Sequence, residues 1–308
     1  MKGLGYRFLV RMTRLCGPWL LVVFSRIVAA GYFLFSSKVP ESRRFYGALF
    51  PERSSLYHLW CTFKQYQNFT TIHLDRFLAS RTDTTTFTSQ GWEKLEAVIG
   101  KQGGILLMSH LGNWEIAAKL LRQQKDDLRL LLYMGVKEKE GVEHMQKEDL
   151  RRAGVTIIGV DQDGGSPFAA VDGIRHLQAG GIVSITGDIV WRSDQRKIRV
   201  TFLGHDAYVP AAPYIFALLS GAPLFVFFAF RTGTNEYRFT LSDPIAIKPH
   251  ARRDRDPAIT AAAQQYADLL EKMLRQHPFE WYHFERFLQL PENSKEPGEE
   301  KTAGFNEA

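Results

Sequence analysis

The sequence predicts an α/β fold, in which a mostly parallel central sheet is flanked by helices and follows an N-terminal membrane-associated helical segment. Two observations support this prediction. Short apolar segments alternate with amphipathic ones from about residue 84 to residue 276, and the first 45 residues mix apolar runs with basic side chains. Strands that alternate with helices form parallel sheets, and 308 residues suffice for one large domain of this kind.

The N-terminal segment is both basic and apolar. Residues 1–45 carry eight Lys or Arg and one Glu, a net charge of +7, whereas the rest of the chain carries −1. Residues 15–36 reach the length of a spanning helix, about 20 residues, only if Arg26 is included. The alternatives are an interfacial helix among anionic headgroups and a buried core helix with a basic rim. We expect membrane contact, and the nearly neutral remainder of the chain argues against nucleic-acid binding.

The remaining elements follow in order. Residues 41–80 are predicted to be helical, because aromatic and aliphatic residues recur at helical spacing. Residues 84–88 are predicted to form a strand, after which Ser89 is expected to cap a helix over 90–100. Further strands are predicted at 105–108, 128–133, 155–160, 182–186, 198–202, 224–230 and 237–241. Further helices are predicted after Gly112, near 142–152, and at 168–178, 213–219 and 258–276.

The chain is expected to divide into three parts. Residues 1–40 form the anchor or interfacial helix, and residues 41–290 form one domain. Residues 291–308 are polar and Glu-rich without an apolar period, which predicts a disordered tail.

The most informative stretch lies where strand 105–108 ends. His110 follows this strand, and Gly112 and Asn113 form a turn into a helix whose first turn contains Glu115. Ligands of open α/β sheets bind at the carboxyl ends of strands. The spacing lets Glu115 reach one imidazole nitrogen and leave the other as a general base, while N–H donors near Gly112 and Asn113 can stabilise an oxyanion. In the alternative, purely structural interpretation, His110 ends the strand and Glu115 favours the helix N-terminus.

Other kinds of site find little support in the sequence. Two cysteines exclude a disulfide framework or a Cys-rich zinc module, and no His-Glu-x-x-His is present. Gly-x-Ser-x-Gly, Walker A and Gly-x-Gly-x-x-Gly motifs are also missing. We therefore expect neither a metal nor a cofactor.

Four segments resemble one protein family. His110-Leu-Gly-Asn-Trp-Glu115 resembles the His-x4-Glu motif of the bacterial lipid A biosynthesis acyltransferases, the lauroyl and myristoyl transferases of the lysophospholipid acyltransferase superfamily. Residues 180–188 resemble the family's Gly-rich turn, strand and acidic residue, here Asp188. Residues 200–210 resemble its Phe-Phe-Gly-x-x-Ala segment, and residues 277–287 its Pro-x-x-Trp-x-x-x-x-Arg signature. With the basic, apolar N-terminus, the resemblance covers roughly residues 5–290.

The chain departs from the family pattern at two places. Ile189 and Val190 follow Asp188, where the family usually has Gln-Asp or Arg. The strand predicted at 128–133 is followed in the family by Arg-Pro, which residues 133–136 lack. Both departures fall where the acceptor is expected to bind, so the acceptor is a lipid A precursor or another hydroxylated or aminated lipid.

The resemblance implies a glycerol-phosphate-acyltransferase-like fold in residues 41–290 and an activity. A fatty acyl chain passes from an acyl thioester, carried by acyl carrier protein or coenzyme A, to a hydroxyl of a membrane lipid, without a covalent acyl-enzyme. His110 is the implied general base and Glu115 its orienting carboxylate. The implied location is the bacterial inner membrane, with the catalytic domain on the cytoplasmic side.

Arginines are the candidates for binding acceptor phosphates, which favour bidentate cations. Arg192 and Arg231 each lie at a predicted strand end, and Arg151 and Arg152 fall near an arginine that the family uses. Asp188 is expected to orient such an arginine, although each arginine is otherwise an ordinary solvated charge. The competing functions are a lipid ester hydrolase, in which His110 activates water, and a non-enzymatic membrane-binding protein.

Overall fold

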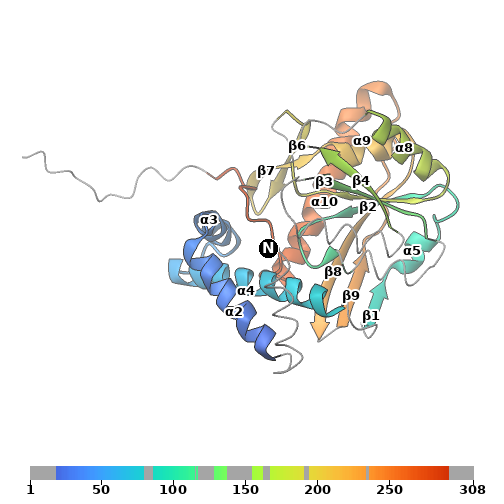
Figure 1. Ribbon diagram of the computed structural model, residues 1–308. Coiled ribbons are helices and arrows are strands. Elements are labelled where there is room, and N and C mark those ends of the chain that lie inside the picture. Colours follow the sequence, from blue (N-terminus) through green and yellow to red (C-terminus); the bar gives the residue numbers. More distant parts are fainter. Residues whose placement is uncertain are drawn as a thin grey trace, which may run out of the picture.

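A seven-stranded sheet forms the centre of the part of the chain that the structure describes (Figure 1). The computed structural model describes residues 19–79, 86–114, 116, 128–136, 155–161, 167–190, 194–233 and 236–290. The strand order is β1-β9-β8-β2-β5-β3-β4, and every neighbouring pair is parallel except β8 and β9. The predicted mostly parallel α/β sheet is therefore confirmed.

The strands of this sheet agree closely with those predicted. The sheet contains β1 (Thr86–Gln90), β2 (Gly104–Met108), β3 (Leu130–Val136), β4 (Thr156–Asp161), β5 (Ile182–Thr186), β8 (Leu224–Gly233) and β9 (Glu236–Leu241). A separate two-stranded sheet pairs β6 (Lys197–Phe202) with β7 (His205–Pro210).

The helices lie on both sides of the sheet. Among the described residues they are α5 (Trp92–Glu96), α8 (Pro167–Gln178), α9 (Ala212–Ser220) and α10 (Arg255–Gln276), which starts after the short 3₁₀ helix η1 (Arg252–Asp254). The helix expected near 142–152 lies outside the described residues.

Both faces of the sheet are buried, which explains the unbroken apolar run of β2. Ile105 and Leu107 point into one core cluster, which also contains side chains of α9 and α10. Leu106 and Met108 point into the other, which includes Trp92 and Leu95 of α5. Burying each such side chain stabilises the fold by about 1.5–3 kcal/mol before the loss of conformational entropy is counted.

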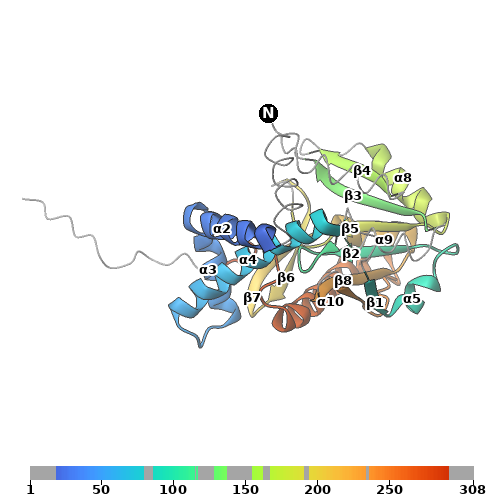
Figure 2. The same cartoon turned by 60° about the horizontal axis from the view of Figure 1, so that its bottom comes forward.

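In the described part of the chain, three helices precede the sheet and pack together on one side of the molecule, away from α5 and α8 (Figures 1 and 2). They are α2 (Trp19–Phe35), α3 (Val39–Leu49) and α4 (Ser55–Ala79), so the helical prediction for 41–80 is confirmed with a break at Pro51. In the described part of the chain, no single helix has the length and apolar character needed to cross a membrane. One pair has both, namely Val22–Phe35 together with Val39–Leu49, which is bent by 92°.

One predicted helix start was wrong. Ser89 does not cap a helix, because it lies within β1 and pairs with Phe239 of β9. The helix begins instead after Gly91, whose φ of 85° turns the chain out of the strand. A side chain at this position would also come within 2.9 Å of the Leu241 carbonyl oxygen, so the turn requires glycine.

The sequence did not predict β7. It runs antiparallel to β6 after a two-residue turn, in which both Leu203 (φ 52°) and Gly204 (φ 77°) are left-handed. Two consecutive left-handed residues are typical of tight hairpin turns. Because β7 starts with the polar residues His205 and Asp206, it lacks the apolar run that indicates the other strands.

Candidate active site

Strand register brings the two central residues of the site together. Met108 of β2 pairs with Thr186 of β5 in the parallel sheet, and the Gly187 N–H continues the ladder to the Met108 carbonyl at 2.7 Å. His110 and Asp188 each lie two residues beyond this pair. Both side chains therefore emerge at the carboxyl edge of the sheet, where ligands of such folds bind.

Asp188 accepts three hydrogen bonds. Its Oδ1 is 3.0 Å from His110 Nδ1, and its Oδ2 accepts from the His110 backbone N–H at 2.7 Å and from Trp281 Nε1 at 2.9 Å. The Asp188 side chain is fully buried, whereas 25% of the His110 side chain is exposed. His110 thus lies between a buried carboxylate and the surface.

This environment keeps the carboxylate ionised. Burial by itself would raise the pKa of Asp188, but His110, His283 and the Trp281 N–H outweigh it and lower the pKa to about 2. An ionised carboxylate can only accept, so His110 Nδ1 must carry the proton of this hydrogen bond. The unprotonated nitrogen of neutral His110 is then Nε2, as a general base requires.

The hydrogen-bond partners of Asp188 among the described residues are His110 and Trp281. We expected this residue to orient an arginine; Arg151, Arg152 and Arg192 lie outside the described residues, so that role stays a prediction. Glu115, the carboxylate expected beside His110, lies outside the described residues, and its role stays a prediction. The sequence did contain a signal for the pair, because a polar residue follows each of two apolar strands at the same distance.

The turn after His110 is held tightly in place. Gly112 has φ 83°, and a side chain there would overlap the Ala229 carbonyl of β8. The Gly112 N–H donates to the Glu280 carbonyl at 2.9 Å, and the Asn113 N–H donates to the Ala229 carbonyl at 2.7 Å. We expected N–H donors near Gly112 and Asn113 to stabilise an oxyanion, and the N–H groups of these two residues are already hydrogen-bonded within the protein.

The Asn113 side chain has a structural role. Its Oδ1 accepts from the Ile116 N–H at 3.4 Å, the contact of a helix N-cap, and its Nδ2 donates to the Tyr237 hydroxyl at 3.4 Å. Only 1% of the residue is exposed. Asn113 therefore positions the turn, and its predicted part in substrate binding finds no support in these contacts.

A segment from the C-terminal part of the chain completes the site. The Tyr282 N–H donates to the His110 carbonyl at 2.9 Å, and Trp281 forms a β-bridge with Leu111. The His283 ring lies edge-on to that of His110 at a centroid distance of 6.4 Å. Burial lowers the pKa of His283, even though Asp188 acts in the opposite direction, so His283 is neutral at pH 7.

The sequence alone did not indicate roles for Trp281 and His283 within the site. In the sequence, Trp281 appeared only as part of a family signature, and it lies 93 residues after Asp188 in the chain. The signal available for both was the unusual density of aromatic residues and histidines in residues 277–287.

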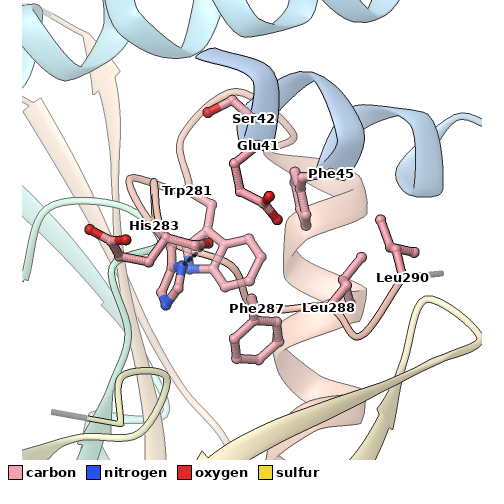
Figure 3. A pocket seen from close by; sticks show the side chains of 9 residues that line it. Glu41, Ser42, Phe45, Trp281, His283, Phe287, Leu288 and Leu290 are labelled. Carbon is pink, nitrogen blue, oxygen red and sulfur yellow. Dashed lines mark hydrogen bonds between the residues drawn. The ribbon is translucent and has the colours of Figure 1, made fainter. Parts of the chain in front are cut away.

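A hollow lies next to this segment (Figure 3). Glu41 and Phe45 project into it from α3, opposite Trp281, His283 and Phe287. Its lining is largely apolar, and two of its residues also contact the pair, because Trp281 donates to Asp188 and the His283 ring lies edge-on to His110.

Of the predicted arginines, the structure places Arg231. It lies in β8 with its side chain exposed, two residues beyond Ala229, which contacts the turn at Gly112 and Asn113. This brings a cation to the edge of the sheet that carries His110. Arg192, Arg151 and Arg152 lie outside the described residues, and their roles stay predictions.

The family model for bacterial lipid A biosynthesis acyltransferases matches residues 62–289. The chain belongs to this family. It is therefore an acyltransferase enzyme of lipid A and lipopolysaccharide biosynthesis, whose substrates are an acyl donor and a lipid acceptor. The matched range contains His110, Asp188, Trp281 and His283. A comparison with curated proteins finds no match.

Metal ligands do not gather in the part of the chain that the structure describes: no three His, Cys, Asp or Glu side chains there are placed to hold one ion. The expectations of no metal and no cofactor stay predictions.

Proposed function

We propose that this acyltransferase moves a fatty acyl chain from an acyl thioester, carried by acyl carrier protein or coenzyme A, to a hydroxyl of a lipid A precursor or a related lipid. The observation that carries the proposal is the bond between His110 Nδ1 and the buried, ionised Asp188. It leaves Nε2 as the basic nitrogen of a partly exposed ring at the carboxyl edge of the sheet.

In the proposed reaction, His110 Nε2 removes the proton of the acceptor hydroxyl as its oxygen attacks the thioester carbonyl. The carbon–sulfur bond of the resulting tetrahedral intermediate then breaks, and the leaving thiolate takes the proton from the imidazolium. Asp188 stabilises the imidazolium and holds the ring in one orientation, as the carboxylate does in Ser-His-Asp triads. We retain Glu115 as a candidate for a second carboxylate acting on the same imidazole.

Acceptor binding is assigned to cations at the same edge. Arg231 is exposed close to the turn that follows His110, which suits a phosphate of the acceptor. Arg192 follows Asp188 by only four residues, and Arg151 and Arg152 fall near an arginine that the family uses. Bidentate contacts from such side chains would hold the lipid headgroup while its hydroxyl meets Nε2.

We place the protein on the inner membrane, with its catalytic domain on the cytoplasmic side. Large apolar side chains are exposed along α2, including Ile27 at 65% and Leu34 at 70%. An exposed apolar helix in a chain with a strongly basic N-terminus suits an interface containing anionic lipids. The assignment of the side rests on these basic residues.

The proposal is tested by measuring thioester consumption with and without acceptor lipid. We expect the wild type to consume thioester rapidly only with acceptor, and His110→Ala to lower this rate by at least about 10²-fold. Near-normal turnover by a folded His110→Ala variant would contradict the role of His110. Rapid consumption without acceptor would instead indicate a hydrolase that uses His110 to activate water.

A further inference from the structure

We infer that Trp281 is a positioning residue for the reaction, whose indole N–H fixes the Asp188 carboxylate and thereby the orientation of His110. The inference rests on the proposed function, since it assigns a partner to the carboxylate of the general base. It also gives a specific role to an aromatic residue that is distant in the chain and has no proposed contact with substrate.

The contacts on Asp188 show what Trp281 contributes. Oδ1 faces His110 Nδ1, while Oδ2 accepts from the His110 backbone N–H and from the Trp281 indole. Because donors hold both oxygens, rotation of the carboxylate would break at least two hydrogen bonds in a fully buried site. Without the indole, one backbone N–H would hold Oδ2 alone.

Trp281 is itself held firmly enough to do this. Only 1% of the residue is exposed, and its carbonyl accepts from Gln65 Nε2 of α4 at 2.6 Å. Phe45 and Phe287 pack edge-on against the indole, each at a centroid distance of 5.0 Å. A ring packed from two sides has a single orientation available, so its N–H points consistently at Oδ2.

A neutral donor suits this position because ionisable side chains surround the carboxylate. His110, His283 and Tyr266 of α10 all interact electrostatically with Asp188. The Nδ1–H of His283 donates to the Glu285 carbonyl at 3.1 Å, so this proton does not go to Asp188. The indole donates to Oδ2 and stays neutral, so it adds no charge to the site. The carboxylate therefore remains the counter-charge for the His110 imidazolium.

The test uses Trp281→Phe, which removes the N–H and keeps an aromatic ring, with Trp92→Phe as the matched control. Trp92 is also buried, but it belongs to the core cluster on the other face of the sheet. We expect Trp281→Phe to lower kcat about 10-fold, the low end for losing a hydrogen bond to a charged group, with little change in the KM for the acyl donor. Trp92→Phe should keep a wild-type kcat. A kcat within about twofold of wild type for Trp281→Phe would overturn the inference.

A double-mutant cycle with Asp188→Asn separates positioning from general support of the fold. If Trp281 acts through the carboxylate, Trp281→Phe should lower kcat less than about twofold in the Asp188→Asn background. An equal 10-fold loss in both backgrounds would show that the indole acts independently of Asp188 and would refute the inference.

Two further measurements keep the inference testable if Trp281→Phe does not fold or if the proposed function is wrong. Benzothienylalanine at position 281 replaces the N–H by sulfur in a ring of nearly the same size, and we expect the same loss of kcat. The downfield proton resonance of the His110 Nδ1–H reports the contact without any turnover, and it should move in Trp281→Phe but not in Trp92→Phe. A wild type without acyl transfer would refute the proposed function, whereas an unmoved resonance would refute the role of Trp281.

Discussion

Replacing Asp188 by Asn tests the arrangement of the site most directly. The substitution nearly preserves the shape of the side chain and removes its charge. The surroundings of Asp188 lower its pKa from 3.8 to about 2, which corresponds to ~2 kcal/mol of stabilisation of the carboxylate over its protonated form. An Asn amide can also donate to His110 Nδ1, which would place the proton on Nε2 and remove the base. Loss of charge and the wrong tautomer together predict a fall in kcat of about 10²–10⁴-fold.

The assay is acceptor-dependent consumption of acyl thioester by purified protein in detergent or vesicles. Asp243→Asn is the matched control, because that carboxylate is 90% exposed and pairs with Lys94 of α5, outside the hydrogen bonds that join Asp188, His110 and Trp281. We expect kcat to fall for Asp188→Asn, the KM for the donor to stay close to wild type, and Asp243→Asn to behave as wild type. If folded Asp188→Asn turns over within about threefold of wild type, Asp188 does not orient the base.

Three other predictions follow from the same structure. The folded pKa of Asp188 is depressed, so its stabilising contribution is present above about pH 4 and is lost as the pH falls towards 2. The free energy of unfolding of the wild type, measured with urea, should therefore fall by about 2 kcal/mol over this range relative to that of Asp188→Asn, and parallel pH profiles of the two proteins would contradict this. Arg231→Ala should raise the acceptor KM about 10–150-fold with little effect on the donor KM, and Arg231→Lys should recover part of the loss. An unchanged acceptor KM would show that Arg231 does not bind the acceptor and would leave Arg192 and Arg152 as the candidates. Replacing Ile27 and Leu34 of α2 by Glu should weaken binding to anionic vesicles at least about 10²-fold. Leu219 of α9 is exposed to a similar degree, 60%, and Leu219→Glu should leave the binding unchanged; equal effects would place the membrane surface elsewhere.

The strands of the sheet were predictable from the sequence because the signal for each strand lies within a few consecutive residues. Strands β2, β5 and β8 are buried on both faces, so each forms a short run of apolar residues between turn residues. The hairpin strand β7 was missed because its buried residues, Ala207 and Val209, alternate with polar and aromatic ones in a short segment. The start of α5 was misplaced because pairing of Ser89 with a strand more than 100 residues away overrode its local preference for capping.

The site was only partly predictable for a similar reason. His110 could be found from its place after an apolar strand, since that signal lies within a few residues. Its pairing with Asp188 depends on β2 and β5 being neighbours in register, which a single sequence does not specify. Trp281 depends in turn on an irregular segment with no periodicity, held against the turn after His110 by backbone hydrogen bonds. The N–H groups of Gly112 and Asn113 donate to that same segment and to β8, and these contacts also join residues that are distant in the sequence.

The N-terminal helices belong to the catalytic scaffold as well as to the surface proposed to face the membrane. Gln65 and Asn68 of α4 donate to the carbonyls of Trp281 and Phe279, and the Tyr46 hydroxyl of α3 donates to the carbonyl of Pro278. These bonds hold the segment whose backbone fixes the His110 turn and whose indole reaches Asp188. The same α4 packs against α2, where Phe63 and Tyr66 contact Phe33. If α2 lies on the bilayer as we propose, this continuous set of contacts fixes the position of His110 relative to the lipid surface, where the acceptor hydroxyl must arrive.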